Sequence, residues 1–171
     1  MTELAKELLT WFEDHGRKNL PWQSSPPNIY HVWLSEVMLQ QTQVATVIEY
    51  FEDFIKTFPD INALAKAKED KVMALWAGLG YYSRARNLHK TAKIISTDFG
   101  GIFPKSHKVL VSLPGIGSST AGAILSLGYN LEAPILDPSV SIVEKVCGAT
   151  HPYELHGAVL DVLHGDPRLP C

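Results

Sequence analysis

One stretch of the chain, residues 109–131, contains no Asp, Glu, Lys or Arg. It is long enough to cross a membrane as a single helix, but Pro114 and the sequence Gly115-Ile116-Gly117 interrupt it near its start. Because glycine permits tight turns and proline interrupts helices, two short buried helices around a turn fit this stretch better than one helix in a bilayer. The stretch therefore predicts a helical hairpin and no membrane span.

Helical periodicity dominates the rest of the chain. Residues 85–99 give the clearest case, because their apolar positions recur in steps of three and four until Gly100 and Gly101 follow. No run of β-branched residues alternates convincingly with polar ones, so we predict an all-α fold. Other helices are expected at residues 4–12, from about residue 32 to residue 43, at 44–54 and at 62–77, with a loop at 20–28.

The composition limits the class of protein. With 171 residues, 46% of them hydrophobic and 19% charged, the chain can form one globular domain, or one domain and part of a second. The net charge of -3 does not indicate a nucleic-acid partner, so DNA binding would need a local basic patch. The two cysteines exclude a disulfide framework, and the N-terminus has no apolar signal core, so we expect a cytoplasmic protein.

The turn in the charge-free stretch carries a possible phosphate site. It reads Leu113-Pro114-Gly115-Ile116-Gly117-Ser118-Ser119-Thr120-Ala121. Glycines let backbone N–H groups approach an anion, and the positive end of the following helix adds to the attraction, so no lysine is needed. An ordinary corner between two helices, closed by glycines, explains the same pattern. The candidate DNA-binding residues here are Leu113, Gly115, Gly117, Ser118, Ser119 and Thr120.

A second segment, Trp33-Leu34-Ser35-Glu36-Val37-Met38-Leu39-Gln40-Gln41-Thr42-Gln43-Val44, carries a candidate general acid. On one helix, Glu36, Gln40 and Gln43 would share a stripe at positions i, i+4 and i+7. A carboxyl group among apolar neighbours is disfavoured as an anion, and a protonated carboxyl can act as a general acid. Glutamines beside it suit the reading of base edges or the filling of a gap left by an extruded base. A solvated helix face is the alternative interpretation.

These two strings resemble those of the A/G-specific adenine DNA glycosylases, a family of the helix-hairpin-helix superfamily related to endonuclease III. The resemblance includes Gly16-Arg17-Lys18-Asn19-Leu20-Pro21-Trp22 and the segment at 75–88, and it extends to Asp137. It implies a helix-hairpin-helix glycosylase fold in which residues 21–132 form a six-helix lobe, with the hairpin at about 108–127. Residues 1–20 would then be a helix of the second lobe, and residues 133–171 a truncated remnant of the cluster-bearing lobe.

The resemblance also implies a function in base excision repair. The chain would be a monofunctional DNA N-glycosylase of the bacterial nucleoid that excises adenine mispaired with 8-oxoguanine or guanine in double-stranded DNA. Glu36 would protonate the adenine, and Asp137, followed by Pro138 as at a helix N-terminus, would oppose the positive charge on the sugar. Relatives of the endonuclease III type carry a lysine where this chain has Ser119. Because serine cannot form a Schiff base, a pyrimidine-specific lyase is disfavoured.

Further DNA contacts are implied by the same resemblance. The tyrosine at the Tyr81 position wedges into DNA near the mispair in that family, with the glutamine at the Gln40 position close by, and we add Gln41 as a candidate. Residues 84–108 hold six Lys or Arg, among them Arg84 and Arg86, against only one acidic residue, and these cations could face phosphates. A solvated amphipathic face explains the cations equally well. A monovalent cation at the hairpin is a further expectation.

The end of the sequence departs from the family. Ser139 replaces the asparagine that assists the catalytic aspartate, and Cys147 and Cys171 cannot supply the four thiolates of the family's [4Fe–4S] cluster, so no cofactor is predicted. The histidines and cysteines after residue 146 follow no standard zinc spacing. The domain that recognises 8-oxoguanine is not expected in this sequence either. The alternative function is an inactive, truncated remnant that binds DNA without catalysis.

Overall fold

A computed structural model of the chain describes residues 19–131, together with Thr10, Asp14, Gly16 and Ala133. Every regular element in this part of the chain is helical, and none of these residues forms a strand, which confirms the predicted all-α class. Apart from Thr10, which is helical, the expected helix at 4–12 falls outside the described residues, as does the predicted remnant beyond Ala133 with Asp137. The proposed division into lobes stays a prediction.

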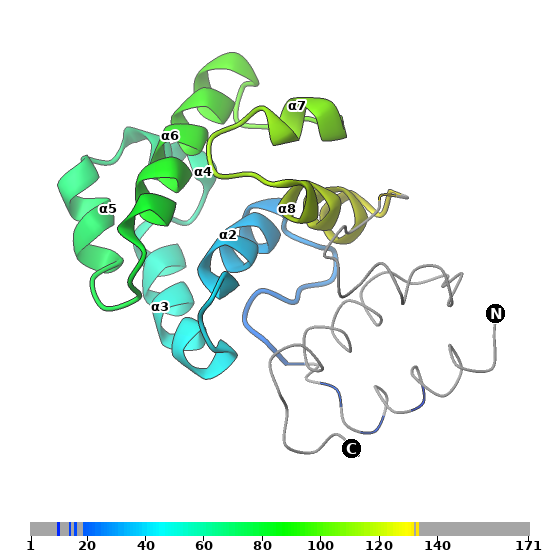
Figure 1. Ribbon diagram of the computed structural model, residues 1–171, viewed down its shortest axis with the longest axis horizontal. Helices are drawn as coiled ribbons and strands as arrows, with labels where there is room; N and C mark the ends of the chain where they lie inside the picture. The colour runs from blue at the N-terminus through cyan, green and yellow to red at the C-terminus, as the bar shows by residue number, and fades with distance from the viewer. Residues whose placement is uncertain (1–9, 11–13, 15, 17–18, 132, 134–171) are drawn as a thin grey trace.

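Helix α2 (Ile29–Leu39) is the centre of the fold. Figure 1 shows it between α3 (Val44–Thr57) and α8 (Ser118–Ala123), and it packs on both. The side chain of Asn28 caps its first turn by accepting hydrogen bonds from the N–H groups of Tyr30 and His31. A helix that contacts neighbours on several sides must be apolar nearly all round. Its buried residues are Tyr30, Val32, Trp33, Leu34, Ser35, Val37, Met38 and Leu39.

The segment at 62–77 was predicted to be mostly helical, and the structure divides it into two short helices. Helix α4 (Ile61–Lys66) ends where Ala67 adopts an extended backbone, with ψ 153°, and α5 (Glu69–Leu75) begins after Lys68. Leu64 from α4 and Val72 from α5 are both buried in the core, and both helices pack on α6 (Tyr82–Asp98). The break lets each short helix bury its own apolar residue against α6.

Helix α6 follows the predicted period and ends where expected, because Gly100 and Gly101 both adopt positive φ angles of 61° and 81°. The predicted helical hairpin follows it. Helix α7 (His107–Val111) leads through the turn at residues 112–117 into α8, which continues as the π-helical segment η1 (Ile124–Gly128). No helix in the described part of the chain is both long enough and apolar enough to span a membrane.

Helix α2 begins earlier and ends earlier than expected. It starts at Ile29 rather than at about residue 32, and it stops at Leu39, before the glutamines. Residues 40–43, called here the glutamine turn, form a non-helical link in which Gln41 has φ 58°. Glu36, Gln40 and Gln43 therefore do not share one helical stripe, and the expectation of a single helix to residue 43 is wrong.

Candidate functional site

Glu36 lies on α2, two turns from its start, with the buried residues Ser35 and Val37 on either side. Its own side chain is half-buried. Ser35 turns inward and donates a hydrogen bond of 2.9 Å from its hydroxyl to the carbonyl of Val32. The carboxyl group therefore sits on a rigid helix at the boundary between the core and the surface, which suits a residue that must meet a ligand in a fixed geometry.

The glutamine turn links the end of α2 to the hairpin. Gln40 and Gln41 are exposed, and the Gln40 amide nitrogen lies 3.5 Å from the hydroxyl oxygen of Thr120 on α8. Thr120 itself is buried. The fold thus brings the helix that carries Glu36 beside the second helix of the hairpin, although the two segments are far apart in the sequence.

Arg84, at the start of α6, is buried, although its charge predicted a position that faces solvent and phosphates. Only 9% of the residue is exposed. One terminal nitrogen, Nη1, donates to the carbonyl oxygens of Val37, Met38 and Gln40, at 3.0, 2.9 and 2.5 Å. These carbonyls lie at the end of α2, where helical backbone lacks its own donors. Arg84 therefore caps the C-terminus of α2 from another element.

The other terminal nitrogen of Arg84 reaches the opposite side. Nη2 donates to the Thr42 hydroxyl at 3.2 Å and to the carbonyls of Leu79 and Gly80 at 3.2 and 3.4 Å. Burial lowers the pKa of this guanidinium, and its interaction with Tyr81 opposes that shift. Since arginine stays charged in proteins in any case, the site holds a fixed buried cation satisfied mainly by carbonyl dipoles.

Tyr81 stands at the N-terminus of α6 as an exposed aromatic residue. Of the whole residue, 61% is exposed, and its backbone adopts the left-handed conformation at φ 49° and ψ 56°. Its ring centroid lies 5.5 Å from the Arg84 guanidinium. A ring held outward in this way is available to stack on a ligand. Tyr82, which is 43% exposed, is not a core residue.

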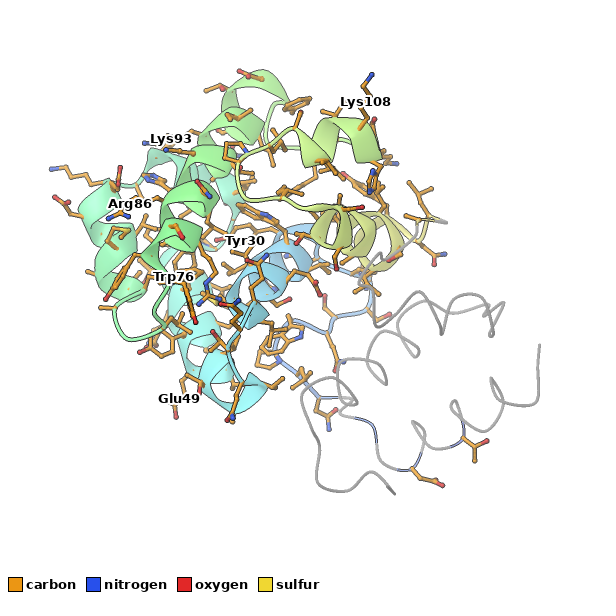
Figure 2. The ribbon with its side chains drawn as sticks, in the orientation of Figure 1. Tyr30, Glu49, Trp76, Arg86, Lys93 and Lys108 are labelled. Atoms are coloured by element: carbon orange, nitrogen blue, oxygen red, sulfur yellow. The ribbon has the colours of Figure 1, made fainter. Side chains whose placement is uncertain are left out.

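Arg86 has a different environment from Arg84. Arg84 and Arg86 are two positions apart, which on an α-helix corresponds to a rotation of about 200°. Their side chains therefore leave α6 on opposite faces. Arg86 is exposed, and Figure 2 shows it on the left of α6, away from α8. Its expected role in DNA binding stays a prediction that concerns a different surface from the glutamine turn.

The hairpin turn presents its two glycines to solvent and buries the residues around them. Leu113 and Ile116 belong to the hydrophobic core, whereas Gly115 and Gly117 are exposed. Gly115 has φ 75°, and a Cβ built on it would lie 2.8 Å from Cβ of Asn87 on α6. The turn is thus pressed against α6 at Gly115, while at Gly117 nothing lies within 4 Å of a built Cβ.

Two contacts of the hairpin were not predicted. Thr91 on α6 donates a hydrogen bond of 2.7 Å to the carbonyl of Pro114, which anchors the turn. His107 on α7 places Nε2 3.2 Å from the hydroxyl of Ser118 on α8, so an imidazole lies at the hairpin. The only sequence signal for the contact between Thr91 and Pro114 is that Thr91 lies one helical turn after Asn87. No sequence signal indicated the contact between His107 and Ser118.

The glutamine turn, α6 and the hairpin enclose a small cavity of about 220 Å³, lined among others by Gln40, Ser83, Arg84, Asn87 and Gly115. Its lining side chains supply amide and hydroxyl groups, which can donate or accept hydrogen bonds. The structure therefore unites four of the predicted segments around one recess: the Glu36 helix, the glutamine turn, the start of α6 and the hairpin. Ser118 and Ser119 begin α8 and are half-buried.

No metal-binding cluster of three His, Cys, Asp or Glu residues exists among the residues that the structure describes. The donors for a [4Fe–4S] cluster do not fit, because the cluster needs four thiolates and this sequence has two cysteines. Both cysteines, like Asp137, fall outside the described residues.

Residues 34–159 match the family of HhH-GPD superfamily base excision DNA repair proteins. The chain is 55% identical over 145 residues to the adenine DNA glycosylase of Buchnera aphidicola subsp. Baizongia pistaciae, a match that covers 84% of this chain and 41% of that protein. It is 40% identical over 151 residues to the adenine DNA glycosylase of Homo sapiens, covering 84% of this chain and 28% of that one. The chain thus spans less than half the length of these relatives.

Solved structures share the fold. A thermostable thymine-DNA glycosylase superposes with a TM-score of 0.76 at 20% identity, over 98% of this chain and 88% of that chain. Endonuclease III in a non-covalent DNA complex superposes with a TM-score of 0.74 at 17% identity, over 92% of this chain and 81% of that chain. At these identities the likeness concerns the fold alone, and it confirms the predicted helix-hairpin-helix glycosylase architecture.

Proposed function

Because the chain belongs to the HhH-GPD superfamily of base excision DNA repair proteins, we propose that it is a monofunctional DNA N-glycosylase that excises adenine mispaired with 8-oxoguanine or guanine. The observation that carries the proposal is the contact between Gln40 and Thr120, at 3.5 Å. It places the helix with the candidate acid, Glu36, beside the hairpin with the candidate phosphate site. The adenine DNA glycosylase relatives support adenine as the substrate base.

The hairpin is proposed to hold the DNA backbone. Gly115 and Gly117 are exposed, so a phosphate can approach the N–H groups of the turn without meeting a side chain. The first N–H groups of α8 lack intrahelical partners and point toward the same place. Leu113 and Thr120 have buried side chains and would contribute through the backbone. We also propose that a monovalent cation binds in this turn.

The chemistry is proposed to divide between two carboxyl groups. Glu36 protonates the adenine ring, which turns the base into a leaving group as the glycosidic bond breaks. Asp137 stabilises the positive charge that develops on the sugar, and water adds to that carbon to leave an abasic site. General acid assistance of this kind contributes about 10²–10⁴-fold to the rate. Tyr81 and the glutamine turn would occupy the stack that the extruded adenine leaves.

The absence of a lyase step follows from the residue on α8. A lysine amine attacks the sugar and forms a Schiff base, whereas the Ser119 hydroxyl cannot. We expect that borohydride traps no covalent complex between the chain and DNA from which adenine is being excised. A trapped complex would contradict the monofunctional assignment while leaving glycosylase activity intact.

The decisive test is a single-turnover assay with the full chain in excess over a duplex containing adenine opposite 8-oxoguanine, followed by alkali to reveal abasic sites. We expect cleavage by the wild-type chain and a loss of about 10²-fold or more in Glu36→Gln. Lys56→Met, which removes an exposed cation from α3, serves as the control and should cleave like wild type. Binding of the duplex without cleavage would instead support the inactive DNA-binding remnant.

A further inference from the structure

We propose that Arg84 is a positioning residue that fixes the glutamine turn and Tyr81 relative to each other, so that both reach the DNA as one rigid unit. The inference rests on the proposed function, since it takes these two segments to be the parts that probe the mispair. It assigns to Arg84 no contact with DNA, in contrast to the expectation from its charge.

The donors of Arg84 point to two separate segments of the chain. Nη1 binds the carbonyls of Val37, Met38 and Gln40, and Nη2 binds the Thr42 hydroxyl and the carbonyls of Leu79 and Gly80. One guanidinium therefore joins Gln40 and Thr42 of the glutamine turn to the two residues that precede Tyr81. A planar group with several donors in a fixed fork is well suited to hold two such segments at once.

Two aromatic rings lie beside the Arg84 guanidinium. Its guanidinium lies 5.5 Å from the ring of the buried Trp76 and 5.5 Å from the ring of the exposed Tyr81. Cations attract the faces of aromatic rings, so the same group that binds the turn also orients the Tyr81 side chain. Trp76 holds the segment from the other side by donating from Nε1 to the carbonyl of Gly80 at 3.2 Å.

Burial separates Arg84 from a residue that contacts phosphate. A phosphate contact needs donors at the surface, but only 9% of Arg84 is exposed. Its two terminal nitrogens donate to five backbone carbonyls of the chain itself, those of Val37, Met38, Gln40, Leu79 and Gly80. Its Nε is buried and has no partner among the described residues. The guanidinium therefore forms its hydrogen bonds with the chain's own carbonyls. The DNA would contact the glutamine turn and Tyr81 instead of the guanidinium.

The first test needs no DNA. The N–H of Thr42 donates to the carbonyl of Leu39 at 3.2 Å, and the N–H of Leu79 donates to Trp76 at 3.1 Å, so these two amides report on the two segments. In Arg84→Met we expect both amides to exchange with solvent about tenfold faster or more, since charge-assisted hydrogen bonds hold both segments. The Ala121 amide in the hairpin, and all three amides in Lys56→Met, should keep their wild-type rates. Acceleration at only one segment, or at neither, would overturn the inference.

The second test separates positioning from a phosphate contact. Affinity is measured for a duplex with adenine opposite 8-oxoguanine and for a matched duplex, each over a range of salt concentrations. Arg84→Met should lower the preference for the mispair by about tenfold while leaving the slope of log affinity against log salt unchanged, and Arg84→Lys should restore part of the preference. A slope reduced by about 0.9, with equal loss on both duplexes, would identify a phosphate contact and overturn the inference.

A third comparison separates positioning from general stability. Ile95→Val removes one methylene from the buried part of α6 and should lower stability without changing the preference for the mispair. Combining Arg84→Met with Tyr81→Ala should give less than the product of the two single effects, because Arg84 acts partly through Tyr81. If the wild-type chain shows no preference for the mispair, the proposed function fails, and amide exchange still decides whether Arg84 joins the two segments.

Discussion

The left-handed backbone at Gly115 makes the packing of the hairpin on α6 directly testable by replacing this glycine with serine. Gly115 has φ 75°, and an added Cβ would lie 2.8 Å from Cβ of Asn87. Because that atom is attached directly to the backbone of α6, no side-chain rotation moves it away. The substitution must therefore shift the hairpin or α6.

The cost can be worked from these contacts. An L-residue in the left-handed region costs about 1–2 kcal/mol, and forcing an extra atom into a packed contact costs about 1–3 kcal/mol. Replacing glycine also reduces the conformational entropy of the unfolded chain, which offsets about 0.4–1 kcal/mol of this cost. We therefore expect Gly115→Ser to lower the free energy of unfolding by about 3 kcal/mol.

Urea unfolding followed by tryptophan fluorescence measures this change, since Trp22, Trp33 and Trp76 are buried in the core. The midpoint should fall by about 1–3 M with the slope unchanged. The matched control is Gly117→Ser, because Gly117 has φ -84° as the N-cap of α8 and no atom within 4 Å of a built Cβ. Serine is favoured at an N-cap, so the control should stay within about 0.5 kcal/mol of wild type. An equal loss of stability in the two variants would show that the contact between Gly115 and Asn87 does not cause the change.

Three further outcomes are expected. Tyr81→Ala should reduce the preference for a mispaired duplex, measured as the ratio of its affinities for mispaired and matched duplexes. Because the residue is 61% exposed, its free energy of unfolding should change by no more than about 0.5 kcal/mol in thermal unfolding. Burial, with a smaller effect of Lys93, lowers the pKa of His89 below its usual 6.5, so the unfolded chain binds a proton that the folded chain does not. Stability should therefore fall as the pH drops below 6.5, and a series of urea titrations should show a flatter dependence in His89→Gln. If the exposed side chain of Arg86 contacts a phosphate, Arg86→Met should reduce the slope of log DNA affinity against log salt concentration by about 0.9. An unchanged slope would show that Arg86 does not contact the DNA.

The orientation of Arg84 could have been predicted from the sequence. The apolar stripe of residues 85–99 includes Leu88, and Arg84 precedes Leu88 by one helical turn, so both point to the same face. Charge alone suggested a position facing phosphates. The stripe, extended by one turn, would have indicated that Arg84 faces the core and Arg86 faces away from it.

The features that were predicted correctly from the sequence are local: the all-α class, the end of α6 before Gly100, and the helical hairpin. Helical period and turn glycines act over a few residues, so they can be read without knowing the fold. The end of α2 depends on the tertiary structure, because the donors that replace its missing hydrogen bonds come from Arg84 on α6. The break between α4 and α5, the contact of Gln40 with Thr120 and the approach of Asn87 to Gly115 likewise depend on segments that meet only when the chain is folded.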